Sequence, residues 1–108
     1  QQYNLGVEES ATPAVLKKYK LNQNYPNPFN SKTLIQFYLP EEVHVTLKIY
    51  NLLGKEIKTL ANGSLHVGVH QIVWDGTDQK GRSMGSGLYF YWLNTASFQQ
   101  VKKMILIR

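Results

Sequence analysis

The sequence predicts an all-β fold, an antiparallel β-sandwich of about seven strands. Short runs in which every second residue is apolar recur at a spacing of roughly 8–12 residues, which is typical of such sandwiches. Glycine, asparagine and proline separate the runs, and no amphipathic helix pattern interrupts them. With 108 residues, 43% of them hydrophobic, the chain can build one core. We therefore expect one domain at residues 19–108, preceded by a linker at residues 1–18.

The linker, residues 1–18, is polar and shows no regular apolar period. Thr12 and Pro13 could cap and begin a short helix. Gly6 and Pro13 interrupt the stretch, however, which favours an exposed tail.

The proline segment, Asn24–Asn30, marks the boundary between this tail and the fold. Pro26 and Pro28 lack N–H donors and have a fixed φ, so the segment cannot be a helix or a central strand. The residues before the two prolines are pushed toward extended geometry. We expect a stiff, extended hinge whose anchors on the folded body are Tyr25, Pro26, Pro28 and Phe29.

The first half of the domain carries three predicted strands. The cleanest alternation is Val43–Tyr50, with its apolar residues on one face and polar residues on the other. Lys32–Leu39 precedes it and the short strand Lys55–Leu60 follows. A turn is predicted at Asn51–Gly54, because Gly54 can adopt a positive φ. A second turn is predicted at Ala61–Ser64, which contains the Asn-Gly pair typical of tight turns.

The second half carries three more strands. They are Gly68–Trp74, Leu88–Thr95 and Phe98–Ile107. The aromatic run Leu88–Thr95 predicts a central strand with both faces covered. Tyr19–Leu21 would supply a seventh strand.

Composition excludes several classes of function. The chain has no cysteine, which excludes disulfides, thiolate catalysis and cysteine-ligated metals. A net charge of +5 suggests nucleic-acid binding, but the basic residues are spread thinly and a binding footprint would be clustered. No apolar run is long enough to cross a membrane. We therefore expect no nucleic-acid partner and no direct membrane insertion.

Three short patterns suggest chemistry that their context does not support. Gly81–Gly85 matches G-x-S-x-G, but a nucleophile elbow needs a strand-to-helix turn on an α/β sheet. His66 and His70 would lie ~13 Å apart in a strand, too far to bind one metal ion. Asp75 and Asp78 lack the calcium-loop spacing and suit turns. The sequence thus predicts no enzyme, no metal site and no cofactor.

Three separate stretches carry a family resemblance. They are Leu21–Asn30, Val45–Ile57, and the pair Trp74–Gly81 and Ser86–Tyr91. In this order and spacing they resemble the C-terminal sorting domain of type IX secretion cargo, the Por secretion type A sorting domain. That family is related in fold to the immunoglobulin-like domain of flagellar hook-capping proteins.

The resemblance covers about residues 19–108, with one departure. Ser31-Lys32 stands where the family usually has Pro-Ser, which loosens the exit from the proline segment. The resemblance implies an immunoglobulin-like sandwich and a secretion signal. Such domains direct an attached cargo through the type IX system across the outer membrane of Bacteroidetes and related phyla.

The same resemblance implies partners and a location. The partners would be the upstream cargo domain and the type IX translocon and sortase components. The domain would pass through the periplasm, would then be secreted or reach the cell surface, and would be cleaved after export, often with attachment of the cargo to surface lipopolysaccharide.

The last strand matches the basic and apolar ending of the family, which suggests that Arg108 is the natural C-terminus and that upstream cargo was trimmed. We expect main-chain pairing at an exposed edge, together with basic side chains, to provide recognition. The residues expected to be read by the translocon are Lys102, Lys103, Met104, Ile105, Leu106, Ile107 and Arg108.

An alternative function is an immunoglobulin-like accessory module of an extracellular enzyme, which binds carbohydrate or packs on the enzyme. In the run Tyr89–Trp92 alternate residues point to opposite faces, and one face must build the core. Trp92 is then the best candidate for an exposed ring that contacts sugar. A structural spacer is a third possibility.

Overall fold

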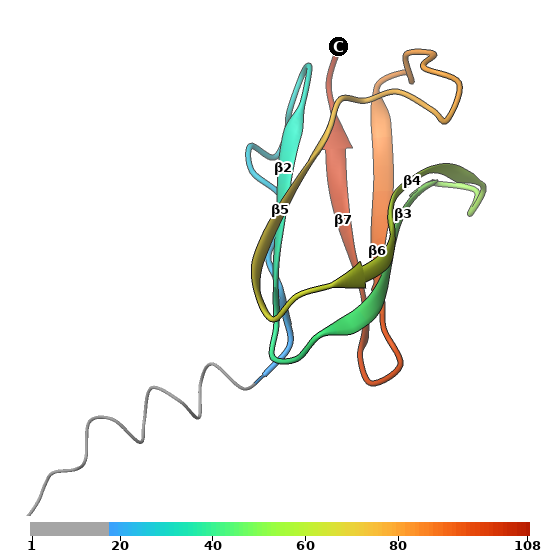
Figure 1. The fold of residues 1–108 in the computed structure, drawn as a ribbon. Helices are drawn as coiled ribbons and strands as arrows, with labels where there is room; N and C mark the ends of the chain where they lie inside the picture. Colours follow the sequence, from blue (N-terminus) through green and yellow to red (C-terminus); the bar gives the residue numbers. More distant parts are fainter. Residues whose placement is uncertain (1–17) are drawn as a thin grey trace, which may run out of the picture.

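The computed structural model describes residues 18–108, which form seven strands in two antiparallel sheets (Figure 1). The strands are β1 (Lys20–Leu21), β2 (Thr33–Leu39), β3 (Val43–Asn51), β4 (Glu56–Leu65), β5 (Gly68–Trp74), β6 (Gly87–Asn94) and β7 (Gln99–Leu106). The predicted all-β sandwich of about seven strands is confirmed.

The two sheets have the strand orders β1-β2-β5 and β4-β3-β6-β7. The chain changes sheet three times: after β2, after β4 and after β5. Strand β6 lies between β3 and β7, as the aromatic run predicted, although only its inward face is buried. None of the described residues forms a helix of the length and apolarity that a membrane crossing requires.

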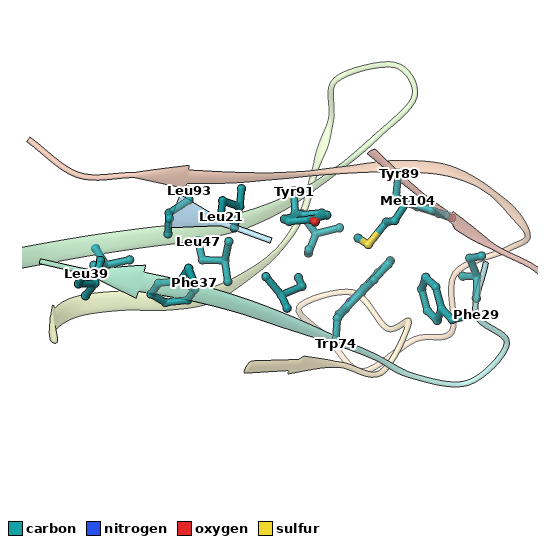
Figure 2. Packing of buried hydrophobic residues seen from close by; sticks show 14 residues of the cluster. Leu21, Phe29, Phe37, Leu39, Leu47, Trp74, Tyr89, Tyr91, Leu93 and Met104 are labelled. Atoms are coloured by element: carbon teal, nitrogen blue, oxygen red, sulfur yellow. The ribbon is translucent and has the colours of Figure 1, made fainter. Parts of the chain in front are cut away.

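The core lies between the sheets because alternate residues of each long strand point inward. Strand β2 alternates strictly between buried and half-buried residues, and β3 and β6 do the same over most of their length. Trp74, at the end of β5, is fully buried, and its ring meets Phe29 at 5.7 Å and Tyr89 at 5.3 Å between centroids (Figure 2). This aromatic group forms the end of the core nearest the proline segment.

The predicted turn at Ala61–Ser64 is wrong, because these residues belong to β4. Asn62 pairs with Thr46 and Gly63 with Val45, so β3 provides a partner for the whole stretch. No non-glycine residue of the described chain has a positive φ, and Gly63 does not either, so the Asn-Gly pair does not form a primed turn. Tertiary pairing with a long neighbour overrides the local turn preference.

Candidate functional site at the C-terminal end of the sandwich

The proline segment connects the two sheets. At one end, Tyr25 forms a bridge to Leu34 of β2, with N···O distances of 3.0 and 2.8 Å. At the other end, Phe29 donates its N–H to Ile105 O at 3.0 Å and accepts from Ile107 N–H at 2.8 Å. Residues close to the start of the domain are therefore bonded directly to its last strand.

The four expected anchors behave differently. Phe29 is buried, at 3% exposure, against Trp74. The side chain of Tyr25 is 78% exposed, so this residue contacts the fold through its backbone and the expectation of an apolar anchor is wrong there. Pro26 and Pro28 are exposed, and each follows a cis peptide bond.

A buried polar group holds the first turn of the segment. The Asn24 side chain, 2% exposed, donates to Thr33 Oγ1 at 2.9 Å and to Pro26 O at 3.2 Å. Thr33 Oγ1 in turn donates to Pro26 O at 2.8 Å. Because buried polar atoms need partners, these bonds hold the segment in one conformation.

Tyr91 of β6 reaches the same segment from the opposite sheet. Its hydroxyl donates to Asn22 O at 2.7 Å and accepts from Asn24 N–H at 2.8 Å. Burial raises the pKa of the Tyr91 hydroxyl to about 12, although the hydrogen bond from the Asn24 backbone acts in the opposite direction. The hydroxyl therefore stays protonated and can serve both partners at neutral pH.

The proline segment also covers part of the β7 edge. Asn27 Oδ1 accepts from Ile105 N–H at 2.9 Å, and Gln23 Nε2 donates to Lys103 O at 2.8 Å. With the bonds made by Phe29, these contacts occupy backbone groups from Lys103 to Ile107 that face away from β6. The expected open edge is thus partly closed by the chain itself.

The residues of the terminal stretch divide by face. Met104 and Leu106 are fully buried, so the folded domain cannot present their side chains to a partner, and the expected recognition surface is corrected for these two. Lys103 is exposed, Ile105 is 42% exposed, and Ile107 is 52% exposed. Lys102, on the other face, is half-buried.

Arg108 joins three segments that are distant in sequence. Its guanidinium donates to Met84 O at 2.6 Å, Gly76 O at 2.9 Å and Asn30 O at 3.4 Å. Its backbone N–H donates to Ser86 Oγ at 2.8 Å. The guanidinium expected to be read by the translocon therefore binds carbonyl groups of the domain itself.

Gly76 makes the approach of Arg108 possible. Its φ of 74° lies in the left-handed region, and a Cβ built on it would lie 2.5 Å from Arg108 Nη2. Any larger residue would therefore displace the guanidinium and strain the backbone.

A groove lies between the proline segment and the end of the chain. It has a volume of about 520 Å³. Its lining residues are Pro26, Pro28, Phe29, Asn30, Ile107 and Arg108. The groove combines rigid proline rings, the exposed half of Ile107 and one cation, which suits an extended apolar segment of a partner.

The aspartates of the neighbouring loop serve turns. Asp78 Oδ1 accepts from the backbone of Lys80 at 2.9 Å and of Arg82 at 2.8 Å, and Oδ2 accepts from Arg82 Nε at 2.8 Å. The hydrogen bond from the Arg82 backbone is the main cause that lowers the pKa of Asp78. The hydrogen bond from the Thr77 side chain lowers the pKa of Asp75.

The other chemical patterns have no site geometry. The stretch Gly81–Gly85 lies in a loop that leads into β6, within a described region that contains no helix. His66 is exposed, whereas His70 is half-buried and stacks on Phe37 at 5.5 Å between ring centroids. Among residues 18–108 no group of three metal-binding side chains occurs.

Trp92, the candidate sugar contact, lies on the outer face of the four-stranded sheet. Its ring is half-buried and meets Tyr50 of β3 at 6.3 Å between centroids. Phe90, two residues earlier on β6, is half-buried on the same face.

Sequence reasoning missed two contributors to the site, Tyr91 and Gly76. It predicts that an asparagine of the proline segment caps nearby backbone groups, as Asn24 does, but the partner Thr33 is visible only in the fold. A tyrosine in an aromatic run gives no sign that its hydroxyl crosses the sandwich. The Trp-Asp-Gly sequence signals a turn, and the proximity of Arg108 depends on the pairing of β7.

The sequence profile of the FlgD Ig-like domain family matches residues 22–97. No curated protein sequence matches the chain. Among solved structures, a region of dimeric latent PorU from Porphyromonas gingivalis superposes with a TM-score of 0.65 at 22% identity, over 83% of this chain and 9% of PorU.

Two further structures are similar. PorZ, described as an essential bacterial surface component of the type IX secretion system of P. gingivalis, superposes with a TM-score of 0.56 at 17% identity, over 94% of this chain and 13% of PorZ. FlgD from P. aeruginosa superposes with a TM-score of 0.55 at 21% identity, over 68% of this chain and 58% of that one. Together with the family match, these likenesses confirm the immunoglobulin-like sandwich.

Proposed function

The chain belongs to the FlgD Ig-like domain family, and on that premise we propose that it is a C-terminal secretion-signal domain. It directs an attached cargo protein through the type IX system across the outer membrane and is cleaved after export. Its partners are the cargo, the translocon and the sortase components, and it passes from the periplasm to the cell surface or medium. No catalysis is assigned to the chain itself.

The observation that carries the proposal is that the three resemblance stretches meet at one end of the sandwich. The first and third stretches are joined by the Phe29–Trp74 contact and by the hydrogen bonds of Tyr91. The second and third are joined by the bond from Gln79 N–H to Ile57 O at 3.0 Å. Stretches that are distant in sequence are therefore in direct contact in the fold.

The similarity to PorZ supports the secretion context. A unit the size of this chain corresponds to 13% of that type IX component. The present chain would likewise be one domain of a larger secreted protein, joined to its cargo through residues 1–18.

The groove beside Ile107 is the surface that we assign to the translocon. Met104 and Leu106 are buried, so recognition falls to Ile107 and the rigid prolines in the groove. The exposed Lys103 and Ile105 lie outside the groove, on β7. Because the groove is already formed, its own residues need little further ordering on binding.

The export experiment attaches residues 19–108 to a neutral periplasmic reporter in a host with a working type IX system. We expect the reporter to reach the cell surface or the medium. A reporter that stays periplasmic, with the intact and folded domain attached, would show that the sorting role is wrong.

Point variants test the groove better than deletion of the last strand, because deletion would remove the buried Met104 and Leu106. Ile107→Asp alters the groove, and Val101→Asp, at a similarly exposed position in β7 outside the groove, is its matched control. We expect export to fall with Ile107→Asp and to persist with Val101→Asp. Equal export of the two variants would show that the translocon does not bind the groove, whereas the sorting role of the domain would stand.

Carbohydrate binding is a second candidate function. It is favoured by Tyr50, Phe90 and Trp92, three half-buried rings on the outer face of adjacent strands. Titration of the chain with soluble and insoluble polysaccharides tests it. Binding that disappears in Trp92→Ala would favour this function over sorting, and no binding by the intact chain would exclude it.

A further inference from the structure

The four outer edges of the two sheets are protected to different degrees. An unpaired edge presents free N–H and C=O groups, and proteins usually cover it or add charges, prolines or bulges. At the edge where the two-residue β1 pairs with β2, Tyr25 forms a further bridge to β2. The end of the β7 edge from Lys103 onward is covered by residues 23–29, and the exposed Lys103 adds a charge there. The β5 edge differs from these.

The β4 edge has two kinds of protection. Its pairing with β3 shifts register twice, and it carries the charged Glu56 and Lys58. Gln79 also bonds the edge, donating its N–H to Ile57 O and accepting from Thr59 N–H at 2.9 Å.

The β5 edge has none of these protections. Gly68–Trp74 contains no Lys, Arg, Asp, Glu or Pro, and it pairs with β2 in continuous register without a bulge. In Figure 1, β5 lies against β2 and no strand follows on its other side.

The register identifies which backbone groups of β5 are unpaired. In an antiparallel pair each residue directs both N–H and C=O to the same side, and successive residues alternate. Leu34 and Gln36 bond toward Tyr25 and Asn22, so their neighbours Ile35 and Phe37 bond toward β5. Since Ile35 and Phe37 pair with Ile72 and His70, the groups that face away are those of Val69, Gln71 and Val73.

These three residues also expose their side chains. Val69 is 61% exposed, Val73 is 51% exposed, and Gln71 lies between them on the outer face. Within residues 18–108, no hydrogen bond from another segment reaches their backbone groups. The edge thus offers a continuous row of donors and acceptors, with the apolar side chains of Val69 and Val73 beside it.

The sequence of this edge is self-complementary. When two copies are placed antiparallel with Gln71 opposite Gln71 of the second copy, Val69 faces Val73 of the second copy. The three outward residues then form hydrogen-bonded pairs, each of which exchanges two N–H···O bonds. His70 faces Ile72 of the second copy, and no charge meets a like charge despite the net charge of +5.

We propose that the β5 edge is an interface between two copies of this chain. The two β5 strands pair about a twofold axis at Gln71, and the two three-stranded sheets join into one continuous sheet. The interface lies on a different strand from the groove at the C-terminal end, and it does not depend on the export role.

Analytical ultracentrifugation of the full chain over a concentration range tests the association. We expect a monomer–dimer equilibrium that Val69→Lys weakens by roughly tenfold or more, because a lysine on an edge strand opposes edge-to-edge pairing and its charge would lie beside the apolar Val73 of the second copy. Val101→Lys, at a position of similar exposure on β7, is the matched control and should leave the equilibrium unchanged. Far-UV circular dichroism checks that both variants fold.

Crosslinking tests the register. The chain has no cysteine, so each introduced thiol is the only one present. A short bifunctional maleimide should link Gln71→Cys into a dimer, since directly opposed residues have Cβ atoms ~4.5–5.5 Å apart, which is wider than a disulfide prefers. A mixture of Val69→Cys and Val73→Cys should link across the two variants, whereas each alone should link poorly.

Three results would overturn the proposal. The chain would remain monomeric up to submillimolar concentration, Val101→Lys would weaken the dimer as much as Val69→Lys, or Val101→Cys would link while Gln71→Cys did not. The first result would leave the edge available to a strand of another protein, and the other two would place the interface elsewhere.

Discussion

Strands β7 and β5 both lie at an outer edge of a sheet, but they differ in whether another segment bonds their outward backbone groups. The outward backbone groups of β7 from Lys103 to Ile107 are bonded by residues 23–29. Those of Val69, Gln71 and Val73 in β5 have no such cover within the described residues. One edge is therefore integrated into the fold, and the other is open for association.

The difference shows what the proline segment contributes. Prolines lack the donors that would extend a sheet indefinitely, so the segment can cover an edge without offering a new one. The hydrogen bonds of its other residues run to Leu34 in one sheet and to Ile105 and Ile107 in the other. The segment thus closes the end of the sandwich and shapes the groove at the same time.

Truncation of Phe29 should have the largest effect on the closed side. Phe29→Ala removes a buried ring from Trp74 and should lower the free energy of unfolding by ~3–5 kcal/mol. Urea unfolding measures the change. Tyr25→Ala is the control, because an exposed side chain should cost less than ~0.5 kcal/mol. Comparable losses in the two variants would contradict the assigned anchor.

Loss of the Tyr91 hydroxyl should have the next largest effect. Tyr91→Phe leaves Asn22 O and Asn24 N–H without their partner and should cost ~1–3 kcal/mol. Urea unfolding at neutral pH measures it. An unchanged stability would mean that water replaces the hydroxyl at no cost.

The same hydroxyl predicts a pH dependence. The pKa is raised in the folded state from 10.0 to about 12, so the folded protein holds this proton when the unfolded chain has lost it. Stability should be constant up to pH 10.0 and should fall as the pH rises toward about 12. Tyr91→Phe should reduce this slope. A slope of the same size in the variant would assign the effect to Tyr19 and Tyr89, whose pKa values burial also raises.

The hydrogen bonds of Arg108 to Gly76, Met84 and Asn30 should contribute less to the free energy of unfolding, because the Arg108 side chain is exposed. Arg108→Ala should cost about 1 kcal/mol, and Lys103→Ala, which removes an exposed cation of the same edge, should cost almost nothing. Gly76→Ala displaces the guanidinium, so its cost should be smaller in the Arg108→Ala background than alone. Additive losses in the double variant would show that the two residues act separately.

The open edge should show the smallest change in stability. Val69→Lys should alter the unfolding free energy of the monomer by less than ~0.5 kcal/mol, because its side chain is exposed. Urea unfolding at high dilution measures the monomer alone. A large loss there would mean that Val69 supports the fold, and its effect on association could then not be assigned to the edge.

The sequence predicted the strands well where period and burial agree. In β2 and β3 the alternating residues face the core as expected, because one face of each strand is buried. The error at Ala61–Ser64 arose because an Asn-Gly pair is a local signal and the pairing with β3 is not.

The candidate site was predicted only in part. The proline segment was identified from its backbone chemistry, which is local. The burial of Met104 and Leu106 depends on the face that β7 presents, and the contact of Arg108 with Gly76 depends on two loops that meet only in the fold. The open β5 edge could not be predicted, since neighbours within a sheet are set by topology.

Amide hydrogen exchange followed by NMR at a low and a high protein concentration tests the contrast between the two edges most directly. We expect the amides of Ile105 and Ile107 to be protected from exchange at both concentrations, because they donate hydrogen bonds to the proline segment. The amides of Val69, Gln71 and Val73 should exchange fast at low concentration and become protected at high concentration. If the amides of Ile105 and Ile107 exchanged as fast as that of Gln71 in the dilute sample, the β7 edge would be as open as the β5 edge, and the contrast between them would be wrong.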